Sequence, residues 1–280
     1  MNGIDFTSLI ALDKRGIFPY ETENVDAFLL RAKETFPPDF VPAEFHDAKP
    51  IPPEVIREGG NLTEKLYAFC RTGDRGFFFT RGVGLLGGGC TVCDLESKRC
   101  FFLLRAPFAR RKKWFCYRRD ELLAHELCHV ARATVDDPAM EEFFAYQTSF
   151  SCLRRAIGDF FSSPYDAIFF LIPTLLLPTA SFAKLMWFPH LPLWCFYLLL
   201  GAVMGFFAIR SRLRRRLISR AMRKLSKFGV RQPLAVLFRS TQKEMKEISA
   251  LSDPAAWQKW IEEKSAKSLR WGIISRRFCA

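Results

Sequence analysis

A chain of 280 residues is long enough to form one or two domains with a buried core. Its formal charge of +13 is uneven, because residues 210–231 hold ten Lys or Arg and no acidic residue. Such a block suits either a nucleic acid or an anionic membrane surface. It directly follows an apolar stretch, which favours the membrane, and we expect no nucleic-acid partner.

The cysteines do not indicate a disulfide framework. There are nine of them, an odd number, scattered along the chain. The first thirty residues carry several charged side chains and no apolar run, so we expect no secretory leader. We therefore predict that most of the cysteines are free thiols in a reducing compartment.

Residues 1–160 show mixed helix and strand patterns. The pattern predicts helices over 22–34 and 53–69, the second broken at Gly59-Gly60. Strands are predicted at 77–79, 90–94 and 100–105, with residues 95–98 turning the second strand onto the third. Asp120 is a suitable N-cap for the helix that contains HELCH, and Pro138 is typical of the first position of the next helix.

Two apolar runs follow this region. Residues 167–188 contain a single charge, at Lys184, and residues 191–209 contain none, so each run can cross a hydrocarbon core about 30 Å thick. Arginines flank the pair on both sides, which predicts that both ends are cytoplasmic. The basic segment after it has apolar residues at helical spacing, typical of a helix on an anionic leaflet.

The HELCH motif carries the chemistry. Residues at positions i and i+4 share one helix face, so His125 and His129 can direct both imidazoles at one zinc ion. Glu126 points slightly aside and can act as general base towards a zinc-activated water. For the third ligand the sequence favours Glu142, on the next helix, with Glu141 as the alternative.

At this point the chain resembles a family. HELCH followed by EFFAY is similar to the gluzincin zinc peptidases, in particular their membrane-embedded members. The resemblance covers about residues 120–150. It implies that His125, His129 and Glu142 bind zinc and that Glu126 activates water. Tyr146 stands where that family has an aspartate that supports a ligand histidine, so Asp136 or Asp137 is a possible substitute.

Other motifs are discounted or left open. Residues 82–87 match GxGxxG, but a strand pattern follows instead of the helix that a dinucleotide site requires. Tyr146 and Tyr117 are candidates to stabilise an oxyanion. A strand beside the metal helix, either 90–94 or 100–105, is expected to receive an extended peptide by strand addition.

The sequence thus predicts an α+β metallopeptidase-like catalytic domain over residues 1–160. A transmembrane helical hairpin over 164–210 and a basic amphipathic helical tail over 211–280 would follow it. The expected function is that of an integral membrane zinc metalloprotease, whose catalytic domain and termini are cytoplasmic. Its expected partners are a peptide or protein substrate and an anionic lipid surface. The alternative is a catalytically inactive membrane-inserted adaptor, for which Glu126→Gln would change nothing.

Overall fold

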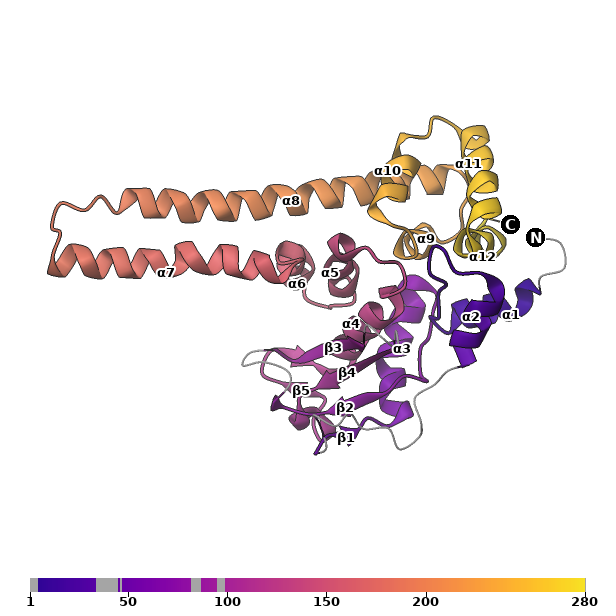
Figure 1. The fold of residues 1–280 in the computed structure, drawn as a ribbon, viewed down its shortest axis with the longest axis horizontal. Coiled ribbons are helices and arrows are strands. Elements are labelled where there is room, and N and C mark those ends of the chain that lie inside the picture. The colour runs from indigo at the N-terminus through magenta and orange to yellow at the C-terminus, as the bar shows by residue number, and fades with distance from the viewer. Residues whose placement is uncertain (1–4, 34–44, 46, 82–86, 95–98, 280) are drawn as a thin grey trace.

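A long helical hairpin projects from a body that contains a four-stranded sheet and most of the helices (Figure 1). The computed structural model describes residues 5–33, 45, 47–81, 87–94 and 99–279. The predicted combination of a mixed helix-and-sheet body with two long apolar helices is confirmed. The GxGxxG glycines at 82–86 and the predicted turn at 95–98 lie outside the described residues.

The sheet has four strands in the order β1-β2-β4-β3. β3 pairs antiparallel with β4, β4 pairs parallel with β2, and β2 pairs antiparallel with β1. β3 is therefore an edge strand and β4 is internal. The strands are β1 (Lys49–Pro50), β2 (Gly76–Phe78), β3 (Gly89–Asp94) and β4 (Arg99–Leu104).

Helices α3 (Pro53–Tyr67) and α4 (Arg119–Arg132) cover one face of this sheet. Phe102 and Leu104 of the sheet pack there against Ile56, Leu123 and Leu127. The link between sheet and α4 holds the 3-10 turn η3 (Ala106–Ala109) and a small ribbon, β5 (Lys113–Trp114) with β6 (Tyr117–Arg118).

The predicted break at Gly59-Gly60 does not occur, because α3 is continuous. A Cβ atom added at Gly59 would lie 2.5 Å from the Leu123 Cβ and 2.6 Å from the Ala124 backbone nitrogen. The glycine therefore allows α3 to pack directly on the backbone of the metal-site helix.

The larger core joins the two ends of the chain. It includes Tyr67 and Cys128 from the first half of the chain, Phe144 from just past the middle, and Ile218 and Trp271 from the second half. The helices around it or beside it are α1 (Phe6–Lys14), α2 (Val25–Lys33), α5 (Pro138–Tyr146), α9 (Pro233–Phe238), α10 (Gln242–Ala250), α11 (Pro254–Lys267) and α12 (Leu269–Phe278).

This packing differs from the prediction that residues 211–280 form a tail on the membrane surface. The apolar face of the basic segment, with Ile218, Ala221 and Leu225, is buried in the larger core. Amphipathic spacing suits a lipid surface and a protein core equally well, and here the core takes the apolar side chains. Residues 211–280 thus share a core with the region that carries HELCH.

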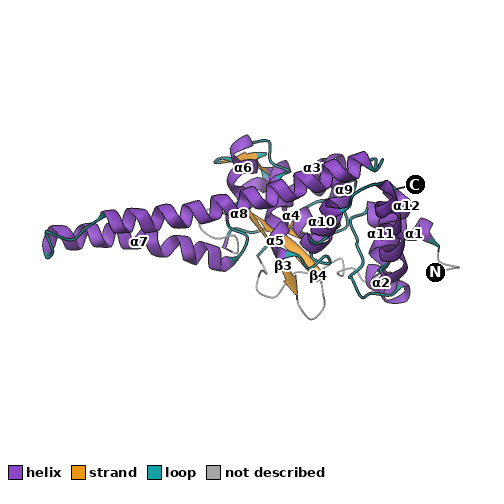
Figure 2. Cartoon of the chain, turned by 90° about the horizontal axis from the view of Figure 1, so that it is seen from above, coloured by secondary structure: helices purple, strands orange, loops and turns teal. Residues whose placement is uncertain are grey.

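The hairpin consists of α7 (Pro164–Met186) and α8 (Trp194–Lys227), which run side by side (Figures 1 and 2). Both are long and apolar enough to cross a membrane, and most of the side chains in their apolar stretches are not buried in the protein. α8 does not end with its apolar run. It continues as a single helix through the basic segment and into the body.

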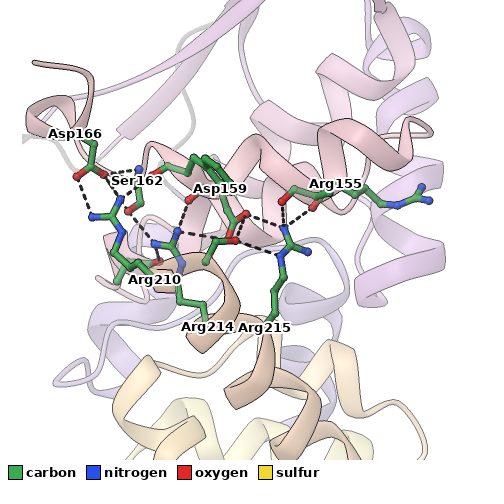
Figure 3. Close-up of polar contacts among 11 residues, drawn as sticks. Arg155, Asp159, Ser162, Asp166, Arg210, Arg214 and Arg215 are labelled. Atoms are coloured by element: carbon green, nitrogen blue, oxygen red, sulfur yellow. Dashed lines mark hydrogen bonds and ion pairs between the residues drawn. The ribbon is translucent and has the colours of Figure 1, made fainter. Parts of the chain in front are cut away.

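Polar contacts at the base of the hairpin connect it to the body (Figure 3). Asp159, fully buried in η4 (Gly158–Phe160), accepts hydrogen bonds from Ser211 at 2.9 Å and from Arg215 at 2.7 Å. Arg210 pairs with Asp166 at 2.6 Å, next to the start of α7. These ion pairs join α8 to the chain that follows α6 (Cys152–Ile157).

Candidate metal centre

The metal-site helix α4 is held on two sides. Leu123 and Leu127 face the core beneath the sheet, whereas Cys128 and Ala131 face the larger core. The side that remains carries the two histidines, and it faces α5 and the edge strand β3.

Three predicted ligands meet at one point. The Nε2 atoms of His125 and His129 are 3.2 Å apart. Carboxylate oxygens of Glu142 lie 3.8 Å from the Nε2 of His125 and 3.6 Å from that of His129. Atoms bonded tetrahedrally to one zinc at 2.0–2.1 Å are separated by about 3.3 Å. The donor set and its spacing therefore fit a zinc-sized ion, and the cluster could hold a metal.

Glu141, the residue before Glu142, contacts His129 from outside the cluster of three ligands. Its Oε2 is 3.2 Å from the Nδ1 of His129, the nitrogen that faces away from the cluster. A hydrogen bond donated by Nδ1 leaves the Nε2 lone pair free for a metal. The backbone of Ala145 hydrogen-bonds the other imidazole, that of His125.

The aspartates suggested as support for a ligand histidine do not provide it. Asp136 lies in the turn before α5, with a left-handed backbone at φ 51°. Asp137 accepts a hydrogen bond from the backbone nitrogen of Gln242 at 2.7 Å. In the part of the chain that the structure describes, Glu141 and Ala145 make the contacts to the imidazoles instead.

Glu126 is buried beside the metal cluster, where the edge strand passes. Its Oε2 accepts a hydrogen bond from the hydroxyl of Thr91 at 2.7 Å. A Cβ added at Gly89 would lie 2.8 Å from its Oε1, so a larger residue on the strand would displace the carboxylate. Burial raises the pKa of Glu126 to about 7, against the opposing effects of His129 and the Thr91 hydrogen bond.

The two imidazoles differ in their affinity for protons. Burial lowers the pKa of His125 well below its usual value, and the nearby His129 lowers it further. Burial also disfavours the protonated form of His129, but its bond to Glu141 and the charge of Glu142 outweigh this and raise its pKa to about 9. In the metal-free protein, His129 therefore carries a proton at neutral pH.

These residues line an open cleft. Its volume is about 460 Å³, and the edge strand and α5 form its walls. A smaller cavity of about 130 Å³ shares Gly89, His125 and Glu126 with it and is also lined by Tyr117, Tyr146 and Arg154. The ring of Tyr146 is centred 4.7 Å from that of His125. Burial raises the pKa of Tyr146 to about 12, so its hydroxyl remains a proton donor at neutral pH.

The sequence alone did not identify several features of this site. The role of Thr91 depends on the approach of β3 to α4, and the role of Glu141 depends on the rotation of α5. No sequence motif predicts either role. Cys93 of β3 forms a disulfide with Cys100 of β4, a pair that the prediction of mostly free thiols did not identify. Their direct opposition in the antiparallel register places the two sulfurs together. The other seven cysteines are free, as predicted.

Comparisons with known proteins found no relative of this chain. No protein-family model, curated protein or solved structure matches the chain.

Proposed function

We propose that this protein is a membrane-anchored, zinc-dependent peptidase. The observation that carries the proposal is the convergence of His125, His129 and Glu142 on one point, with Glu126 buried at its side. Two imidazoles and one carboxylate are the donor set of catalytic zinc sites that keep an open coordination position. A zinc ion held there would supply Lewis acidity to polarise the scissile carbonyl.

Glu126 is suited to general acid–base work. A pKa of about 7 places its two protonation states close in energy at neutral pH. It can therefore take a proton from the attacking water and return it to the leaving amine. Thr91 holds the carboxylate in place during this exchange. Tyr146, protonated at neutral pH, is the candidate donor to the oxyanion.

The edge strand is suited to hold a peptide. β3 lines the metal cleft, and among the described residues it pairs on one side only, with β4. An extended substrate could add to its other side through main-chain hydrogen bonds. β4 is internal and cannot serve in this way. A peptide substrate whose alternate main-chain nitrogens are methylated should therefore be cleaved poorly; cleavage as fast as that of the unmodified peptide would rule out strand addition.

The first test is the metal content of the full-length protein in detergent, measured by elemental mass spectrometry. We expect about one zinc per chain, lost in Glu142→Gln, because a ligand is removed. Glu141→Gln should keep the ligands and lower zinc affinity about 10- to 100-fold, the usual effect of losing outer support. Glu126→Gln should retain zinc and lose peptide hydrolysis.

Two results would contradict the proposal. If folded protein supplied with zinc bound no metal, the proposal of a zinc enzyme would be wrong, and the alternative of a membrane-inserted adaptor would remain. Equal zinc affinity in the native protein and in Glu142→Gln would remove Glu142 from the ligand set.

The membrane anchor is part of the same proposal. The exposed apolar surfaces of α7 and α8 support insertion of the hairpin, and basic residues at both flanks favour a cytoplasmic body. A cysteine introduced at His190, in the turn between the helices, should react with an impermeant maleimide from outside the cell. The exposed Cys116 of the body should react only after permeabilisation. The reverse pattern would refute this topology.

A further inference from the structure

One face of α8 forms a groove lined almost entirely by arginine. Arg212, Arg216, Arg220 and Arg223 follow at helical spacing on its exposed side. Together with Arg215 and Ser219 they surround a hollow of about 400 Å³, here called the arginine groove. The groove lies apart from the metal cleft and shares no residue with it.

The arginines of α8 fall into two groups. Arg210 and Arg214 point inward and pair with Asp166 and Asp159 (Figure 3). Within the described part of the chain, no acidic side chain pairs with Arg212, Arg216 or Arg220, which face outward. Like charges four residues apart repel one another on a helix. Arg215, which also lines the groove, pairs with Asp159, but a bound anion would relieve the repulsion among the three outward arginines.

The groove begins where the apolar part of the hairpin ends. The Arg210–Asp166 pair marks that boundary, and Arg212 lies two residues beyond it. From Arg212 to Arg223 the helix rises roughly 16 Å. The headgroup layer of one leaflet is roughly 5–8 Å thick. The groove thus spans this layer and continues above it, which suits a large headgroup better than a single phosphodiester.

Exposed apolar residues beside the groove favour a membrane over a nucleic acid. Leu153 and Ile157, one turn apart on α6, are 66% and 46% exposed. Arg215 hydrogen-bonds the backbone oxygen of Ala156 at 3.1 Å, so this apolar ridge borders the groove. Phe161 continues it and packs on Phe170 of α7. Apolar side chains next to arginines are typical of surfaces that enter the membrane interface.

We propose that the arginine groove binds the multiply phosphorylated headgroup of an anionic membrane lipid. Guanidinium groups bind phosphate through paired hydrogen bonds, and several arginines around one hollow can contact several phosphates. The inference rests on the proposed insertion of the hairpin but not on the metal site or on peptidase activity.

The test uses the full-length protein in neutral detergent, titrated by calorimetry with soluble short-chain phosphatidylinositol bisphosphate. Each arginine near a lipid surface contributes roughly fivefold to affinity, so Arg212→Gln/Arg216→Gln/Arg220→Gln should bind about a hundredfold more weakly. The matched control, Lys246→Gln/Lys259→Gln/Lys267→Gln, removes the same charge from exposed positions elsewhere and should bind like the native protein. Replacing the three arginines by lysine keeps the charge but loses the paired hydrogen bonds, and should also weaken binding.

Several outcomes would overturn the proposal. Native affinity in the lysine variant, or an equal loss in the control, would mean a diffuse positive field without a defined site. Equal affinity for the free inositol phosphate would remove the lipid as the ligand, and tighter binding of a duplex oligonucleotide would favour nucleic acid. Flotation with phosphatidylcholine vesicles tests insertion separately: failure to float with headgroup binding intact would refute the anchor alone.

Discussion

Gly59→Ala should destabilise the protein and disturb the metal site, although Gly59 touches no ligand. The new Cβ would lie 2.5 Å from the Leu123 Cβ, whereas ordinary contact begins at 3.4 Å, so the helices must separate by 3.4 − 2.5 = 0.9 Å. Overpacking of this kind costs about 1–3 kcal/mol. The better helix propensity of alanine returns about 1 kcal/mol. We expect a net loss of up to about 2 kcal/mol of unfolding free energy.

The effect should reach the metal because Leu123 and Ala124 directly precede His125. A displacement near 1 Å at reacting groups can cost about a hundredfold in rate. Urea unfolding of the full-length protein in mild detergent measures the stability, and a chelator-buffered titration measures zinc affinity.

Gly272→Ala is the control for this variant. Gly272 also lies in a helix, but its nearest neighbour would be 3.5 Å from the new Cβ, in ordinary contact. It should therefore gain about 1 kcal/mol from helix propensity. If Gly59→Ala were as stable as Gly272→Ala and bound zinc normally, the close packing of α3 on α4 would not constrain the site.

Four further predictions concern protons and buried charge. Because the pKa of His129 is about 9 without metal, zinc must displace its proton, and apparent affinity should weaken about tenfold per pH unit from about pH 9 to pH 7. The same raised pKa of His129 should stabilise the metal-free fold below about pH 6.5, and this stabilisation should be lost as the pH rises through about 9. A zinc affinity that did not change with pH would contradict the first prediction, and an unfolding midpoint that did not change with pH would contradict the second. Thr91→Val removes a hydrogen bond that favours ionised Glu126, so its pKa should rise above about 7 and the acid limb of the pH–rate profile should move upward, while Thr91→Ser should not shift it. Asp159→Asn leaves buried arginine charge unpaired and should cost about 3–5 kcal/mol by denaturation, whereas a loss below about 1 kcal/mol would show that the hairpin base is held by other contacts.

The sequence by itself determined those features that depend on local periodicity. His125 and His129 share a face because any helix through HELCH places positions i and i+4 together. The strands at 77–79, 90–94 and 100–105 followed from short apolar runs, and the structure places them within two residues of the prediction. The two apolar helices followed from runs too long and too free of charge for most soluble cores.

Only the tertiary structure decided which carboxylate faces which nitrogen. Glu141 and Glu142 are adjacent and chemically identical, so local pattern cannot separate them. Burial of Met140, Phe143 and Phe144 in the larger core sets the rotation of α5, and that rotation directs Glu142 to the two Nε2 atoms and Glu141 to Nδ1.

The same limit explains the basic segment and the cysteine pair. An amphipathic pattern shows that one face of a helix is buried but not what buries it, and here a core formed by both ends of the chain covers Ile218 and Leu225. The pairing of Cys93 with Cys100 depends on the register between β3 and β4. The burial of the basic segment arises from contacts between distant parts of the chain, and the cysteine pairing from the register of one hairpin. The periodicity of a single segment contains no information about its partner.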